Sequence, residues 1–73
     1  MMGNIEMTKL ATPEVKRTYV FPFGDRLDVK GVSHIAVRPS GNHRLITEDG
    51  SLVIVKGDWL AIEITGGPSH FQL

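Results

Sequence analysis

Three histidines are the residues best suited to acid–base or metal chemistry in this 73-residue sequence. In the strand register derived below, His34 and His43 share a sheet face with Arg38, and His43 lies directly opposite Arg38. A guanidinium cation repels a metal ion, and the spacing of the histidines matches no standard metal-binding pattern. The chain also has no cysteine for a Cys-based zinc site. We therefore expect no metal and no other cofactor, and we interpret the histidines as surface residues.

Serine and aspartate residues give no pattern typical of a catalytic site. Nucleophilic catalysis needs an activated side chain beside a base that a third group holds in place. None of the serines lies in a Gly-x-Ser-x-Gly context, and no phosphate-loop string is present. The aspartates are typical of turns, where their side chains hydrogen-bond the local backbone: Asp25, Asp28, Asp49 and Asp58. The sequence therefore predicts a protein that is not an enzyme.

The charge balance weakens a nucleic-acid function without forbidding a local basic patch. Eight basic and eight acidic residues give a formal net charge of zero, whereas non-specific affinity for phosphate backbones comes from excess lysine and arginine. No apolar run approaches the roughly 18 residues of a membrane span. The first ten residues also lack the basic-then-apolar pattern of a secretory signal. We expect a cytoplasmic protein with no membrane partner.

Turn signals divide the C-terminal half of the chain into apolar stretches. They lie at 39–42, at Asp49-Gly50 and at Gly57-Asp58, and the two dipeptides are typical of two-residue hairpin loops. They predict four sequential antiparallel strands at 32–38, 43–48, 51–56 and 59–64. An earlier strand is predicted at 16–21 from its β-branched and aromatic residues, and the chain can be extended again at 27–29.

The predicted loops also set the strand register. They place Ile35 opposite Ile46, Ile46 opposite Val53, and Val53 opposite Ile62, and directly paired residues share a face. One face then collects the expected core: Ile35, Val37, Ile46, Val53, Val55, Leu60, Ile62 and Ile64. The other face is mixed: His34, Ala36, Arg38, His43, Leu45, Thr47, Leu52, Ile54, Trp59, Ala61 and Glu63.

These observations predict a mostly-β fold, a small antiparallel meander of four to five strands. At this length it is expected to curl into an SH3-like half-barrel or barrel. We divide the chain into a flexible N-terminal tail at 1–11, one β domain at 12–64 and a C-terminal tail at 65–73. The mixed face is too apolar to face water alone, so the same chain, a second copy or another partner should cover it.

The function that this pattern favours is protein–protein interaction or self-association through the apolar sheet face or an exposed strand edge. The residues expected to contribute to binding are Trp59, Leu52, Ile54, Leu45, Arg38, His34 and His43. The alternative is a small nucleic-acid-binding β-barrel that uses Arg38, Arg44, Lys56 and Trp59, since basic and aromatic groups on a small sheet bind single strands by stacking and phosphate contacts.

Overall fold

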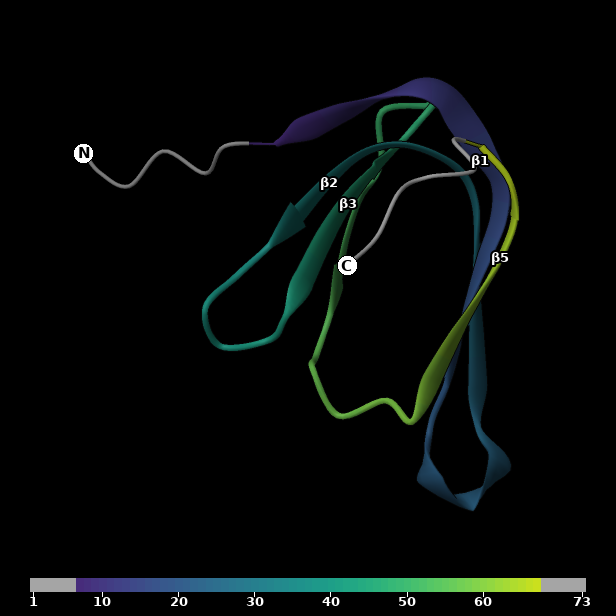
Figure 1. Ribbon diagram of the computed structural model, residues 1–73, viewed down its shortest axis with the longest axis vertical. Helices are drawn as coiled ribbons and strands as arrows, with labels where there is room; N and C mark the ends of the chain where they lie inside the picture. Colours follow the sequence, from purple (N-terminus) through teal and green to yellow (C-terminus); the bar gives the residue numbers. More distant parts are fainter. Residues whose placement is uncertain (1–6, 68–73) are drawn as a thin grey trace.

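The computed structural model describes residues 7–67. They form one antiparallel sheet of five strands in the order β4-β3-β2-β1-β5 (Figure 1). The strands are β1 (Thr8–Val20), β2 (Arg26–Val37), β3 (His43–Thr47), β4 (Leu52–Val55) and β5 (Ala61–Gly66), and a single 3-10 turn, Pro22–Gly24, joins β1 to β2. The mostly-β prediction is confirmed, and the sheet is open, with β4 and β5 at its edges.

The long first strand starts earlier than the sequence indicated. β1 begins at Thr8, and Leu10 is buried in the core, so the expected tail at 1–11 and the domain start at residue 12 are wrong for residues 8–11. At the other end, β5 runs to Gly66, two residues past the expected limit of the domain at residue 64. Residues 1–6 and 68–73 of the two expected tails lie outside the described residues.

β1, which pairs with β2 on one side and β5 on the other, contains a bulge. Between Lys9 and Glu14 the chain advances five residues, while its partner β2 advances only two, from His34 to Val32. Pro13 falls inside this irregular stretch, where the missing N–H breaks no regular ladder bond. Bulged strands bend, and Figure 1 shows β1 turning sharply before it runs between β2 and β5.

The two turns that flank β3 each differ from the prediction by one residue: the β2–β3 loop, at 39–41, is one residue shorter, and the β3–β4 loop, at 48–50, is one residue longer. At the β3–β4 turn, the N–H of Thr47 donates to the carbonyl of Ser51, and the N–H of Gly50 donates to the carbonyl of Thr47. Gly50 has a φ of 87° and Gly41, in the β2–β3 turn, a φ of 91°. Each loop is thus a type I turn followed by a glycine in the left-handed region, a three-residue loop that ends in a bulge.

These changes in loop length reverse the orientation of β3. Leu45 pairs with both Ile35 and Val53, so the predicted pairing of Ile46 with those residues is wrong. His43, Leu45 and Thr47 point inward and are buried, while Ile46 points to the outer face. Because the shifts at the two turns cancel across β3, Ile35 and Val53 still share the inner face.

The predicted hairpin at Gly57-Asp58 does not form. After β4 the chain crosses to the opposite edge of the sheet, where β5 pairs with β1 through Ile62 opposite Tyr19 and Ile64 opposite Arg17. The expected pair of Val53 with Ile62 is therefore absent. The meander is confirmed only for β1 to β4, and β5 pairs with β1 at the other edge of the open sheet.

The core lies on the concave side of the sheet. Its buried apolar members are Leu10, Tyr19, Val29, Val32, Ile35, Leu45 and Val55, and Phe21, Val53, Trp59 and Ile62 pack around them. Of the expected core, Ile35 and Val55 are buried and Val53 and Ile62 are half-buried. Val37, Leu60 and Ile64 are instead exposed at the ends or edge of the sheet.

Strong curvature of the sheet brings its two ends together over this core. Two strands lie between β3 and β5 in the sheet order, a separation of about 14 Å in a flat sheet. Yet Trp59, which precedes β5, has its ring centroid 4.3 Å from that of His43 on β3. The sheet must curl for these rings to meet.

Candidate functional site

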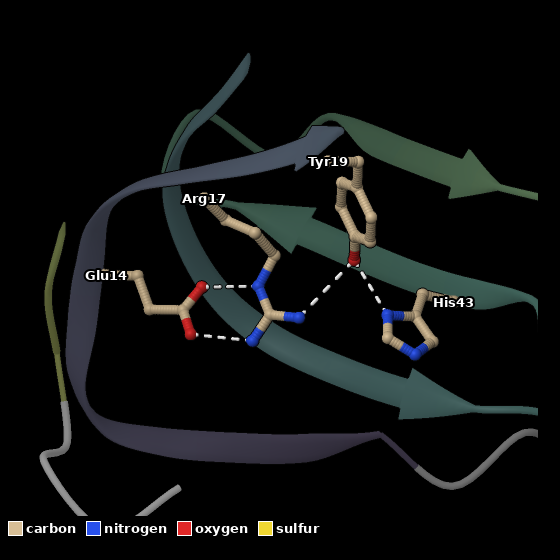
Figure 2. Close-up of polar contacts among 4 residues, drawn as sticks. All are labelled: Glu14, Arg17, Tyr19 and His43. Atoms are coloured by element: carbon tan, nitrogen blue, oxygen red, sulfur yellow. Dashed lines mark hydrogen bonds and ion pairs between the residues drawn. The ribbon is translucent and has the colours of Figure 1, made fainter. Parts of the chain in front are cut away.

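A chain of polar side chains crosses the interior between β1 and β3 (Figure 2). Nε and Nη2 of Arg17 donate to the two carboxylate oxygens of Glu14 at 2.8 and 2.7 Å. Nη1 of Arg17 lies 3.4 Å from Oη of Tyr19, which in turn lies 2.7 Å from Nδ1 of His43. All four residues are at most 2% exposed, so this network is part of the core.

Local strand geometry explains why these side chains meet. Arg17 and Tyr19 are two residues apart on β1 and share its inward face. Glu14 lies where the register of β1 against β5 shifts, and this irregularity places its carboxylate beside Arg17. His43 joins them because the three-residue β2–β3 loop turns it inward.

Burial and charge define the protonation of the network. Burial and the charge of Arg17 lower the pKa of His43, so its imidazole is neutral. Burial raises the pKa of Tyr19, which the hydrogen bond and charge of Arg17 only partly offset. Burial opposes the charge of Arg17, but hydrogen bonds to Glu14 and Tyr19 outweigh it and raise the pKa of Arg17. Since Arg17 donates to Oη, Tyr19 donates its own proton to Nδ1 of His43, whose ring proton is then on Nε2.

Trp59 covers the His43 end of the network. Its ring centroid lies 5.2 Å from that of Tyr19 in an edge-on arrangement and closer still to His43. Such aromatic pairs add stability beyond their buried area. Trp59 therefore links the β4–β5 connection to the two strands that carry Tyr19 and His43.

The arrangement is chemically suited to holding the sheet in its curled form. Within the described residues no buried side-chain nitrogen or oxygen lacks a hydrogen-bond partner, and the four network side chains contact one another rather than solvent. A network with all its members satisfied rigidifies a core and specifies one arrangement of it. Between residues 7 and 67 no three His, Asp or Glu side chains gather where they could hold a metal ion.

The outer face of β4 presents a different kind of surface. Leu52 and Ile54 are 55% and 56% exposed on this edge strand. Bonded and non-bonded pairs alternate along an antiparallel ladder. Since Thr47 bonds Ser51, Val53 must bond Leu45, and the backbone groups of Leu52 and Ile54 point away from β3. No strand of the described residues pairs with that side.

The residues singled out from the sequence fall into two separate groups. Leu45, His43 and Trp59 face the interior, so the interpretation of His43 as a surface residue is wrong. The others lie outside the core. His34 is half-buried, with Nδ1 2.8 Å from the hydroxyl of Ser33. Leu52 and Ile54 remain together on the exposed edge.

The basic residues of the nucleic-acid alternative spread over three elements. Arg38 is half-buried at the start of the β2–β3 turn, Arg44 is half-buried on β3 opposite Ile54, and Lys56 is exposed just after β4. Trp59, their proposed stacking partner, packs against His43.

Sequence reasoning missed Glu14 and Arg17. One signal was available for Arg17, because Arg17, Tyr19 and Phe21 alternate along one predicted strand and therefore share a face. Two aromatic neighbours on that face indicate the interior. Glu14 carried no such signal, since its position depends on the bulge in β1.

The fold and the two sites define an open, curled, all-β domain with a polar core network. Comparisons with protein-family models, with curated proteins and with solved structures gave no match. No helix in the described part of the chain is long and apolar enough to cross a membrane. The function must therefore be inferred from the residues themselves.

Proposed function

We propose that this protein is a small non-enzymatic interaction module that self-associates through the open edge of β4. Two copies would pair their β4 strands antiparallel, giving one continuous sheet. The observation that carries the proposal is the outward-facing backbone of Leu52 and Ile54, whose side chains are also exposed. Protein association by strand addition uses such main-chain groups for affinity and the neighbouring side chains for specificity.

The sequence of β4 supports this use of the edge. Natural edge strands are protected by charges, prolines or bulges, but β4 reads Leu-Val-Ile-Val with none of these. The opposite edge strand β5 contains Glu63, a charge that opposes pairing there. The zero net charge of the chain also offers little repulsion between copies.

Symmetry selects one register for the pair. A two-fold axis perpendicular to the sheet keeps the outer faces of both copies on the same side, so one residue must lie opposite its own copy. An axis at Val53 places Leu52 opposite Ile54 of the second copy and joins the exposed aliphatic side chains. It also pairs the outward backbone groups of these two residues, as an antiparallel ladder requires.

Cysteine cross-linking tests this register, because the chain has no native cysteine. In the proposed pair the Cα atoms of the two Val53 residues are about 4.5 Å apart, which suits a disulfide. Those of the two Leu52 residues are about 8 Å apart from the strand rise and spacing. We expect Val53→Cys to form a covalent dimer under mild oxidation, and the more exposed Leu52→Cys to do so much more slowly. Equal or reversed yields would refute the register.

Sedimentation velocity tests the association itself. A concentration series from about 10 μM to about 1 mM spans weak to moderate affinities. We expect a monomer–dimer equilibrium that Ile54→Lys abolishes. Leu60→Lys is the control, because it places the same charge at another exposed aliphatic residue. A monomer throughout the series, or a dimer that Leu60→Lys disrupts and Ile54→Lys does not, would contradict the proposal.

We also infer that the open sheet is an SH3-like half-barrel and that the protein acts in the cytoplasm. The strand order, with β1 between β2 and β5, and the curl that joins Trp59 to His43 support the first inference. The absence of cysteine is consistent with a reducing compartment and supports the second. Neither inference identifies a partner, because a fold of this kind serves many functions.

A further inference from the structure

The turn between β1 and β2 holds an aromatic residue in a conformation that favours glycine. Gly24 donates its N–H to the carbonyl of Phe21 at 3.3 Å, and Phe21 donates to the carbonyl of Asp25 at 2.8 Å. Phe23 has φ 72° and ψ 11° and follows Pro22. These angles are those of the third residue of a type II turn, a position where glycine or asparagine is the usual choice.

The fold makes no use of the Phe23 ring. Its relative exposure is 103%, so the ring buries nothing against the part of the chain that the structure describes. Among the described residues other than glycine, Phe23 is the one with a positive φ, a conformation disfavoured for a side chain with a Cβ atom. Both strain and solvent exposure oppose a phenylalanine here, so contact with another molecule would explain it better than folding does.

A shallow hollow of about 470 Å³ lies beside this ring. Its lining residues are Phe21, Pro22, Phe23, Asp25, Arg26 and Asp58. Phe21 is anchored because it packs against the core. Asp58 comes from the β4–β5 connection, which lies at the same end of the molecule as the β1–β2 turn in Figure 1. The hollow is therefore built from two loops that the fold brings together.

The acidic and basic side chains around the hollow differ in whether they have a charged partner. Arg26 is paired with Glu63 at 2.5 Å, so its positive charge is balanced. Within residues 7–67, the carboxylates of Asp25 and Asp58 have no side-chain hydrogen bond or ion pair. Lys56, the basic residue nearest to Asp58 in the sequence, does not line the hollow. The hollow thus combines aromatic faces with two available negative charges.

We propose that this hollow, the Phe23 site, binds a lysine or arginine side chain of a partner protein. The cation would lie over the phenylalanine rings, where the ring quadrupole attracts it, and Asp25 and Asp58 would supply charge-assisted hydrogen bonds. The apolar stem of the side chain would lie against Pro22 and Phe21. Phosphates of a nucleic acid would be repelled by the same carboxylates. The site is separate from the β4 edge, and neither proposal depends on the other.

An amide NMR titration tests the site with blocked arginine, N-acetyl-arginine amide, as the probe. Blocked citrulline, which has nearly the same shape without the charge, is the matched ligand. We expect saturable shifts at Phe23, Gly24 and Asp58 with a dissociation constant on the order of millimolar, and binding of citrulline about tenfold weaker. Absence of saturation, equal binding of the two ligands, or shifts located elsewhere would overturn the proposal.

Two variants separate binding from folding. Phe23→Gly should abolish arginine binding and raise the midpoint of urea unfolding, because it relieves the left-handed strain. The double variant Asp25→Asn/Asp58→Asn should weaken binding about tenfold, whereas Glu48→Gln, an exposed carboxylate at the β3–β4 turn, should not change it. A lowered unfolding midpoint for Phe23→Gly would assign the ring a structural role and overturn the inference.

Discussion

The buried ion pair of Glu14 and Arg17 predicts strongly non-additive effects on stability. The perturbation is a double-mutant cycle that consists of Glu14→Leu, Arg17→Met and the double variant. Each single change leaves one charged or polar group in the core without its partner. The double change removes both and leaves an apolar pair of roughly similar length.

The structure sets the expected size of these effects. The two side chains are 0% and 1% exposed and share a bidentate contact, and breaking such a pair typically costs about 3–5 kcal/mol. A domain of this length has a free energy of unfolding of about 4–11 kcal/mol at the usual stability per residue. Glu14→Leu should therefore remove much of the stability of the fold. Arg17→Met should cost somewhat less, since a buried carboxylate can take up a proton.

The double variant should be more stable than either single variant. Replacement of a buried ion pair by apolar residues of similar volume is often neutral or stabilising. We therefore expect a total loss of about 2 kcal/mol or less, from the lost hydrogen bond between Arg17 and Tyr19. The coupling energy between positions 14 and 17 would then be several times the usual value for exposed pairs.

Equilibrium urea unfolding at neutral pH measures these differences, followed by Trp59 fluorescence and far-ultraviolet circular dichroism. The exposed pair of Arg26 and Glu63, whose side chains are 52% and 59% exposed, is the matched control cycle, and it should show a coupling below about 1 kcal/mol. Equal couplings for the buried and exposed pairs would refute the reasoning, as would a double variant less stable than both single variants.

Other predictions concern His43 and the two loops next to it. The pKa of His43 is lower in the folded protein than in the unfolded chain, so below about pH 6.5 the unfolded chain binds more protons than the folded protein. The free energy of unfolding should therefore fall, as the pH is lowered through this range, by up to about 1.4 kcal/mol per pH unit. Urea unfolding between pH 7.5 and 5 should show this loss, which His43→Gln removes and His34→Gln does not. Gly57→Ala should lower the melting temperature, because the new Cβ would lie 2.5 Å from the carbonyl oxygen of Gly41. Asn42→Ala should lower it less, by removing only the 2.9 Å bond from the N–H of Gly57 to Oδ1; equal melting temperatures for the wild type and Gly57→Ala would contradict this contact.

The local features of the sheet could be predicted from composition and turn chemistry. β-branched residues and Gly-containing turns indicated the strands that became β2, β3 and β4, and Asp49 was correctly assigned to a turn, where its carboxylate accepts the N–H of Ser51 at 3.0 Å. These features depend on backbone preferences within a few residues. Leu52 and Ile54 were assigned to the same mixed face, but their strand was expected between two others, whereas β4 is an edge strand and both side chains are exposed.

The register of β3 shows where local reasoning failed. Asp49-Gly50 is compatible with both a two-residue and a three-residue loop, since glycine supplies a positive φ in either. A change of one residue in a loop turns every side chain of the next strand to the other face. The shorter β2–β3 loop therefore moved Leu45 and His43 to the interior and Ile46 to the outside, and the longer β3–β4 loop returned Val53 to its expected face. Nothing within the turn itself distinguishes the two loops.

The sequence by itself determined the β class, most of the strand-forming segments and the positions of the two turns that flank β3, because these follow from the conformational preferences of neighbouring residues. Only the tertiary structure decided that β5 crosses to β1 and that Glu14, Arg17, Tyr19 and His43 meet in the core. Those outcomes depend on pairing between distant segments and on satisfying buried polar groups, and both are properties of the whole packed chain.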